Sequence, residues 1–210
     1  MKIAILILFQ CFILSLPLAV ASGRIVLFLG DSLTAGLGVE AEEAYPDLVG
    51  EMLKADGVTG VRIVNGGLSG STSASVLNRL RWYGRVKPNV LFLAMGANDG
   101  LRGLTVAEME KNLDAVIIAA KAQGMSIILA GMELPPNYGE EYTGAFRKVY
   151  ADLAARHQAL LIPFLLEGVG GVAALNQADG IHPNAEGHRC IASLVYPLLK
   201  NQLQTLSAQP

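Results

Sequence analysis

Five almost uninterrupted runs of apolar residues, each of strand length, recur along the chain and constrain its fold more than any other feature. They are Ile25–Leu29, Val61–Val64, Val90–Met95, Ile127–Ala130 and Leu160–Ile162. The apolar residues follow one another instead of alternating with polar ones, which is typical of strands covered on both faces. The sequence therefore predicts a five-stranded parallel sheet.

Segments with helical periodicity separate these runs. Val106 to Ala122 carries an apolar stripe at helical spacing, and Thr105 with Glu108 predicts a capping box at its start. Further helices are expected at Tyr45–Ala55, Ser73–Trp82, Glu141–His157 and Ala185–Leu199, the last perturbed by Pro197, with a loose polar tail from Gln202. Alternating strands and helices predict a flavodoxin-like, doubly wound three-layer α/β/α fold.

The amino terminus reads as a secretory signal peptide. Lys2 precedes an apolar run from Ile3 to Leu18, and Ala19-Val20-Ala21 is a small-x-small cleavage site. A retained membrane anchor is the alternative, but the short apolar core and the small residues favour cleavage after Ala21. We therefore expect residues 1–21 to be a signal peptide and residues 22–210 to be one periplasmic or secreted domain without a stable membrane anchor.

Charge and cysteine content narrow the possible partners. The chain has 16 basic and 18 acidic residues, a net charge of −2, so nothing in it recruits nucleic acid. After cleavage only Cys190 remains, which excludes an intramolecular disulfide and indicates an inert buried thiol. We expect a monomer that is stable through packing alone.

Polar or glycine-rich clusters follow the predicted strands. They are Gly30–Leu33, Asn65–Thr72, Gly96–Gly100 and, after a longer loop, Asp179–Pro183. The carboxyl ends of parallel strands meet at one edge of a sheet, where ligands bind. These four clusters should therefore converge on one crevice.

Ser32 is the candidate nucleophile in that crevice. A serine hydroxyl needs a base at neutral pH. His157 reads as a solvated or capping side chain and His188 as structural, which leaves His182 as the base and Asp179 as the group that orients it. A simple Asp-Gly turn with a bystander histidine is the alternative.

An acyl-transfer site also needs donors for the developing oxyanion. The candidates are the backbone amides of Ser32 and Gly70 and the side-chain amide of Asn98. Plain turn geometry at Gly70 and an Asx turn at Asn98 are the competing interpretations.

Together these residues resemble the sequence blocks of the SGNH (GDSL) hydrolases. The blocks fall on Ser32 in Gly-Asp-Ser-Leu, Gly70 in Leu-Ser-Gly-Ser-Thr, Asn98 in Gly-Ala-Asn-Asp, and Asp179 with His182 in Asp-Gly-Ile-His-Pro-Asn. The resemblance spans nearly all of residues 22–210. It implies a compact exported serine esterase that acts on acyl esters, thioesters and lysophospholipids, with arylesterase and thioesterase activity. Ser71 departs from the acidic residue usual in the thioesterase-type members, and we expect it to alter loop contacts instead of chemistry.

Two segments are candidates for the walls of a substrate groove. Pro136 and Tyr138 would form a stiff wall, and Leu165 and Leu166 belong to an apolar stretch that either lines an acyl-chain groove or packs on the core as a short helix. A carbohydrate O-deacetylase using the same residues and a non-catalytic acyl-chain binding protein remain alternative functions. The chain has no Gly-x-Ser-x-Gly elbow, Walker loop or persuasive metal set, so no cofactor or metal is expected.

Overall fold

All five strands run parallel in one sheet. The computed structural model describes residues 23–207, so the predicted signal peptide lies outside the described residues. The strands are β1 (Arg24–Gly30), β2 (Val61–Gly67), β3 (Val90–Ala94), β4 (Ser126–Ala130) and β5 (Leu160–Ile162), in the order β2-β1-β3-β4-β5. This order is the flavodoxin-like one, so the predicted fold is confirmed.

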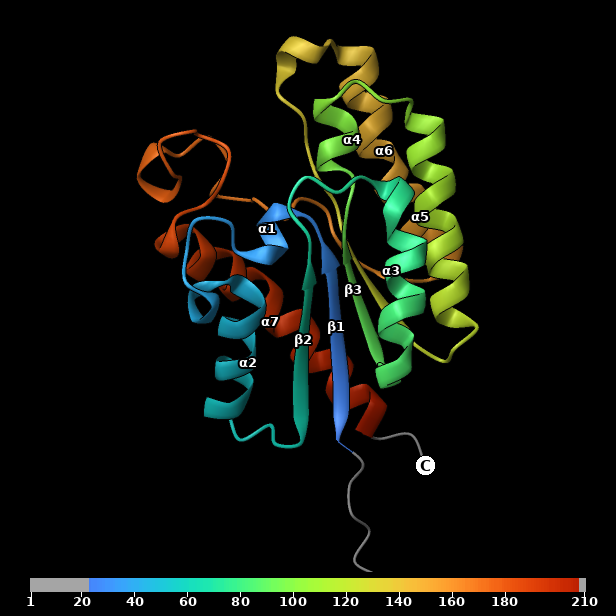
Figure 1. Ribbon diagram of the computed structural model, residues 1–210, viewed down its shortest axis with the longest axis vertical. Helices are drawn as coiled ribbons and strands as arrows, with labels where there is room; N and C mark the ends of the chain where they lie inside the picture. The colour runs from blue at the N-terminus through green and yellow to red at the C-terminus, as the bar shows by residue number, and fades with distance from the viewer. Residues whose placement is uncertain (1–22, 208–210) are drawn as a thin grey trace, which may run out of the picture.

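Helices cover both faces of this sheet (Figure 1). The structure has α2 (Tyr45–Ala55) and α7 (Ala185–Ser207) on one face, and α3 (Val76–Tyr83), α5 (Val106–Lys121) and α6 (Glu140–His157) on the other. The short helices α1 (Ser32–Ala35) and α4 (Ala97–Leu101) follow β1 and β3 directly at the carboxyl edge. The 3-10 turns are η1 (Ala41–Glu43), η2 (Ser73–Ser75), η3 (Gly84–Val86), η4 (Pro136–Tyr138) and η5 (Ala173–Leu175). The start of β1 and the end of α7 both lie at the opposite, amino edge (Figure 1).

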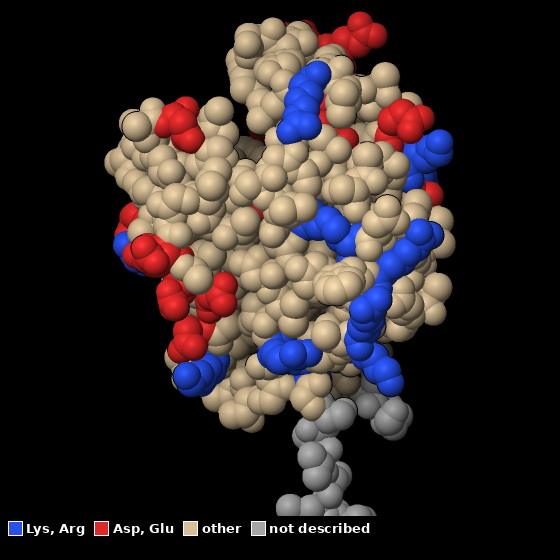
Figure 2. All heavy atoms as spheres, in the orientation of Figure 1, with Lys and Arg blue, Asp and Glu red and all other residues tan. Residues whose placement is uncertain are grey.

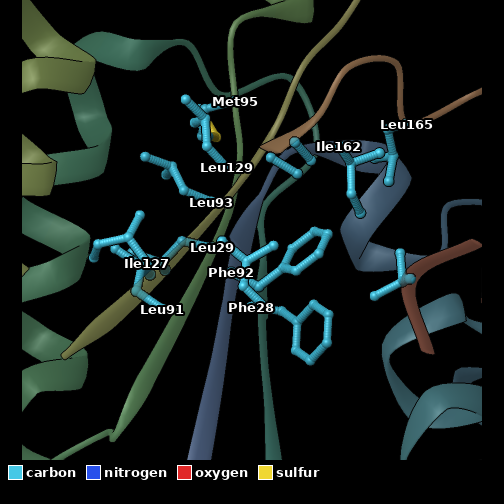
Figure 3. Packing of buried hydrophobic residues seen from close by; sticks show 14 of the residues in the cluster. Phe28, Leu29, Leu91, Phe92, Leu93, Met95, Ile127, Leu129, Ile162 and Leu165 are labelled. Atoms are coloured by element: carbon cyan, nitrogen blue, oxygen red, sulfur yellow. The ribbon is translucent and has the colours of Figure 1, made fainter. Parts of the chain in front are cut away.

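The central strands are fully buried, as their continuous apolar runs predict. Phe28 and Phe92 point to one face (Figure 3), where their ring centroids are 4.8 Å apart. Tyr45 of α2 packs edge-on against Phe28. Leu91 and Leu93 point to the other face. Because both faces of the sheet are packed, the strand ends are held rigidly relative to one another.

Two local predictions were wrong. Thr105 occupies the N-cap of α5 but makes no side-chain capping hydrogen bond. The tail from Gln202 is not loose up to Ser207, because α7 continues through Pro197 to that residue. Leu203 is fully buried, so the apolar face of α7 extends past the proline and its packing outweighs the polar composition of the tail.

The structure also shows no helix, within residues 23–207, with both the length and the apolar character needed to cross a bilayer.

One acidic side chain is buried where β1 meets α1. Asp31 is the N-cap of α1, and its Oδ1 accepts a hydrogen bond from the Leu33 N–H at 3.1 Å. Only 2% of the residue is exposed, and this burial raises the pKa of the Asp31 carboxyl to about 6. The folded protein therefore binds a proton more tightly than the unfolded chain at this position.

This raised pKa predicts how Asp31→Asn changes stability. Asparagine also caps helices but carries no charge, so it removes the cost of burying a carboxylate. The wild type should lose stability relative to the variant as pH rises from about 4 to about 6. The rise in the Asp31 pKa from 3.8 to about 6 corresponds to a change of about 2–3 kcal/mol in the difference between the two free energies of unfolding. This difference should not change further above about pH 7. Urea unfolding of both proteins across this range measures it, and a difference that stays constant with pH would contradict the assignment.

Candidate active site

The turn that presents Ser32 has little freedom. A Cβ atom on Gly30 would lie 1.8 Å from the Thr34 Oγ1, so only glycine fits at the end of β1. A Cβ on Gly67 of β2 would lie 2.2 Å from the backbone nitrogen of Ala35, so α1 rests directly on the neighbouring strand end. Ser32 itself is 9% exposed at the start of α1. Close packing thus fixes the position of its hydroxyl.

The loop between η5 and α7 brings a histidine to this hydroxyl. The His182 Nε2 lies 2.9 Å from the Ser32 Oγ, although the two residues are 150 positions apart. The His182 Nδ1 lies 2.6 Å from the Asp179 Oδ2. Because an ionised carboxylate only accepts hydrogen bonds, Nδ1 carries a proton and Nε2 accepts from the serine hydroxyl. The structure therefore brings Ser32, His182 and Asp179 into one hydrogen-bonded row.

The carboxylate of this row is strongly held in its charged form. The Asp179 Oδ1 accepts backbone hydrogen bonds from His182 at 3.0 Å and from Ile181 at 2.9 Å. The backbone N–H of His182, the imidazole and the N–H of Ile181 hold the pKa of Asp179 well below its usual range. Asp179 thus stays ionised at any pH at which an imidazole can act as a base.

Three candidate oxyanion donors have no competing partner. Within the described part of the chain, the backbone amides of Ser32 and Gly70 and the side-chain amide of Asn98 donate no hydrogen bond to another residue. An Asx turn would need the Asn98 Oδ1 to accept from the Gly100 N–H, but that N–H donates to the Gly96 carbonyl at 3.0 Å, which disfavours this interpretation. Gly70 is the third residue of a turn closed by the Ser71 N–H to the Leu68 carbonyl, and its φ of 73° suits a type II turn. Turn geometry and an available amide therefore coexist at Gly70.

A buried carboxylate links the segments that carry two of these donors. Asp99 lies beside Asn98 in α4 and is 4% exposed. Its two carboxylate oxygens accept from the backbone N–H and the hydroxyl of Ser73 at 2.8 and 2.6 Å. The Arg102 Nη2 also donates to the Gly70 carbonyl at 2.7 Å. The loop after β2 and the segment after β3 are thus joined by two sets of hydrogen bonds, one through Asp99 and one through Arg102.

Arg79 is a positioning group that the sequence analysis missed. Its guanidinium donates to the carbonyl oxygens of Gly30 and Gly66 and, at 2.9 Å, to the Ser71 Oγ. A lone arginine in a helix gives no sequence signal for such a role. The serine at position 71, which also donates to the Leu68 carbonyl at 2.7 Å, does take part in loop contacts.

A cavity of about 660 Å³ opens beside the row of catalytic candidates. Its lining is mostly apolar and comes from the loops after β1, β3, β4 and β5. Besides Ser32, Asn98 and His182 it includes Leu33, Ala97, Leu101, Met132, Leu134, Pro135, Pro136, Phe164, Leu166 and Ile181. Figure 2 shows a notch in the upper part of the molecule, with charged side chains of both signs on the lobes around it, and further acidic ones over α2 and basic ones over α3. Two acidic residues, Asp31 and Glu133, also belong to the lining, so the wall is mainly but not wholly apolar.

The predicted substrate walls are only half supported. Pro136 and Leu166 line the cavity. Leu165 does not, because its side chain points inward and is fully buried in the core (Figure 3). Tyr138 lies outside the lining, and its hydroxyl donates to the Leu101 carbonyl at 2.9 Å. Phe164 begins the apolar stretch to which Leu165 and Leu166 belong, and it lines the cavity. Met132 was not predicted, although it follows β4 at this edge.

The other two histidines lie away from the cavity. His188 is buried, its Nδ1 accepts from the Tyr45 N–H at 3.3 Å, and burial lowers its pKa to about 4. Its predicted structural role fits this neutral acceptor. His157 is not solvated as expected, since only 12% of its side chain is exposed and its Nε2 lies 2.7 Å from Asp114. Among residues 23–207, no group of three or more histidine, cysteine or acidic side chains could hold a metal ion.

Known proteins share both the sequence pattern and this architecture. Residues 28–190 match the model of the GDSL-like lipase/acylhydrolase family. The chain is 40% identical to esterase TesA of Pseudomonas aeruginosa over 93% of its own length and 97% of that protein. It is 34% identical to thioesterase 1/protease 1/lysophospholipase L1 of Escherichia coli, over 93% and 90% of the two chains.

A solved structure agrees with these sequence matches. The psychrotrophic esterase EstA from Pseudoalteromonas, inhibited by monoethylphosphonate, superimposes with a TM-score of 0.81 and 31% identity, covering 86% of this chain and 99% of that one. Fold, motif order and relatives agree over almost the full length. The chain belongs to the GDSL-like lipase/acylhydrolase family.

Proposed function

We propose that this protein hydrolyses acyl esters and thioesters through a covalent acyl-enzyme on Ser32. The row of hydrogen bonds from the Ser32 hydroxyl through His182 to Asp179, beside an apolar cavity, carries the proposal. Relatives named as an esterase and as a thioesterase and lysophospholipase support the same reaction class.

The three side chains of the row have different roles in this mechanism. The His182 Nε2 takes the proton of the Ser32 hydroxyl as the oxygen attacks the acyl carbonyl. Asp179 holds the imidazole in the required tautomer and stabilises its protonated form. His182 then protonates the leaving alcohol or thiol, and water activated by the same imidazole releases the acid.

The negative charge on the carbonyl oxygen needs donors during both steps. The backbone amides of Ser32 and Gly70 and the side chain of Asn98 are the proposed donors, because none of them is engaged elsewhere among the described residues. Fixed donors of this kind stabilise the transition state without reorganising at the moment of reaction.

The lining of the cavity favours acyl chains longer than acetyl. Leucine, methionine, phenylalanine and proline side chains offer apolar surface to a chain of several methylene groups. A carbohydrate O-deacetylase would instead need polar groups to bind sugar hydroxyls, and the mainly apolar wall offers few. The complete serine–histidine–aspartate row argues against a non-catalytic carrier, which would not need it.

The cavity and the amino-terminal sequence also support proposals on the substrates, the location and the assembly of the protein. Small ester or thioester substrates, lysophospholipids among them, fit the cavity, and no nucleic acid or cofactor takes part in the mechanism. We propose that the chain is exported to the periplasm or beyond, from the signal-peptide pattern that ends at Ala21, and acts as a monomer.

Ser32→Ala tests the nucleophile. Without the hydroxyl no acyl-enzyme forms, so hydrolysis of p-nitrophenyl butyrate should fall by about 10⁴-fold or more. A fluorophosphonate probe should label the wild type on the peptide that contains Ser32 and leave the variant unlabelled. Ser193→Ala, an exposed serine on α7, is the matched control and should keep full turnover and labelling. Wild-type turnover by Ser32→Ala would refute the mechanism.

Asn98→Ala tests the oxyanion site. Loss of one donor should lower kcat by roughly 10²–10³-fold, with a smaller change in KM, because the interaction strengthens in the transition state. Asn201→Ala, at an exposed position near the end of α7, should leave kcat unchanged. Equal kcat values for Asn98→Ala and the wild type would remove Asn98 from the site.

The acyl-chain preference follows from the apolar lining. Hydrolysis of p-nitrophenyl octanoate, measured below its micellar concentration, should exceed hydrolysis of p-nitrophenyl acetate by at least about tenfold in kcat/KM. Each buried methylene is worth about 0.8 kcal/mol, so only part of the longer chain needs to enter the cavity. A preference for acetate would favour the deacetylase alternative.

A further inference from the structure

The loop that carries Asp179 and His182 is organised around one residue, Gln177. The Gln177 backbone N–H donates to the His182 carbonyl at 2.7 Å, and its own carbonyl accepts from the Gly180 N–H at 2.9 Å. The Gln177 Nε2 donates to the Pro183 carbonyl at 2.9 Å. These three bonds close the loop on itself.

A fourth hydrogen bond leaves the loop. The Gln177 Nε2 also donates to the Leu37 carbonyl at 2.6 Å, across 140 positions of sequence. Leu37 follows α1, and its N–H donates to the Ser32 carbonyl at 3.1 Å. Two consecutive hydrogen bonds therefore connect the histidine loop to the backbone of the serine. Because both partners of Nε2 are carbonyl oxygens, they also fix which end of the amide faces them.

The chain opposite Gln177 leaves room for this amide. A Cβ atom on Gly38 would lie 2.2 Å from the Gln177 Oε1. Gly38 has a φ of 83°, so the residue after Leu37 both turns the chain and admits the amide. The half-buried glutamine side chain thus lies directly against the segment that it joins.

We propose that Gln177 is a positioning residue that sets the distance between the Ser32 hydroxyl and the His182 imidazole. The inference rests on the proposed roles of those two residues. Asp179 and His182 belong to one loop, so their mutual contact does not fix that loop relative to Ser32. Within the described part of the chain, residues 176–184 and 31–45 share only two hydrogen bonds, Gln177 to Leu37 and His182 to Ser32. The second must break during the reaction, which leaves the first as the lasting hydrogen bond between these two segments. The next bond along the chain, from the Tyr45 N–H to the His188 Nδ1, holds α7 and not the loop that carries His182.

The tie between Gln177 and Leu37 matters because catalysis is sensitive to small displacements. A misplacement of about 1 Å between reacting groups lowers the rate by up to about 10²-fold. Loss of the two donors should therefore lower kcat more than KM, since the cavity that binds the acyl chain is lined by other residues.

Gln177→Met and Gln177→Lys form the test. Methionine has similar length but no donor, whereas the lysine ammonium can donate to both carbonyl oxygens. With p-nitrophenyl butyrate, we expect Gln177→Met to lower kcat by about 10–100-fold and to change KM by less than about threefold. If the methionine variant loses about a hundredfold in kcat, the kcat of Gln177→Lys should be at least about tenfold higher than that of Gln177→Met. Gln123→Met is the matched control, because Gln123 also donates to a backbone carbonyl, that of Ala119, but lies outside the cavity lining.

The His182→Ala background separates positioning from general damage. If Gln177 acts through the imidazole, Gln177→Met should lower the residual activity of His182→Ala by less than twofold. Unchanged kcat in Gln177→Met, equal loss in Gln123→Met, no recovery in Gln177→Lys, or a full additional loss in the His182→Ala background would each overturn the proposal. Urea unfolding of each variant shows that the assays compare folded proteins, and Gln177→Lys supplies the test if the methionine variant does not fold. Absence of turnover in the wild type would instead refute the proposed function.

Discussion

The parallel direction of the strands is the constraint on which the site depends. Because all five strands run the same way, each delivers the residue after its carboxyl end to the same edge of the sheet. Ser32 follows β1, Asn98 follows β3, and the loop after β5 leads to His182. Packed helices on both faces hold these ends in place, so groups 150 residues apart in sequence meet at hydrogen-bond distance. No single loop contains the site.

The loops after β1, β2 and β3 are braced by buried or half-buried polar groups. Asp31 caps α1, and Asp99 in the segment after β3 accepts hydrogen bonds from Ser73 in the segment after β2. Arg79 donates to carbonyl oxygens at the ends of β1 and β2. Buried carboxylates are costly to desolvate, as the raised pKa of Asp31 shows. This destabilising carboxylate lies at the sharp turn between β1 and α1, beside the cavity. Stability and precise placement are therefore in conflict at Asp31.

The sequence predicts the sheet, the main helices and the meeting of Ser32, Asp179 and His182 because these depend on apolar periodicity and on motifs with fixed spacing. It fails where the outcome depends on tertiary packing. Leu165 and Leu166 are adjacent and equally apolar, but only the contact with the core decides that the first is buried and the second faces the cavity. The extension of α7 beyond Pro197 depends on the burial of Leu203. The role of Arg79 depends on its hydrogen bonds to Gly30, Gly66 and Ser71, which no local sequence pattern reveals.

The placement of the two chain ends has a practical consequence. The start of β1 and the end of α7 lie at the amino edge of the sheet, on the side away from the cavity (Figure 1). A tether attached at either end, to a bead, a surface or a fused domain, leaves the crevice facing outward and accessible. Because both ends lie at the edge opposite the crevice, joining them and reopening the chain elsewhere would leave the edge that carries Ser32 undisturbed.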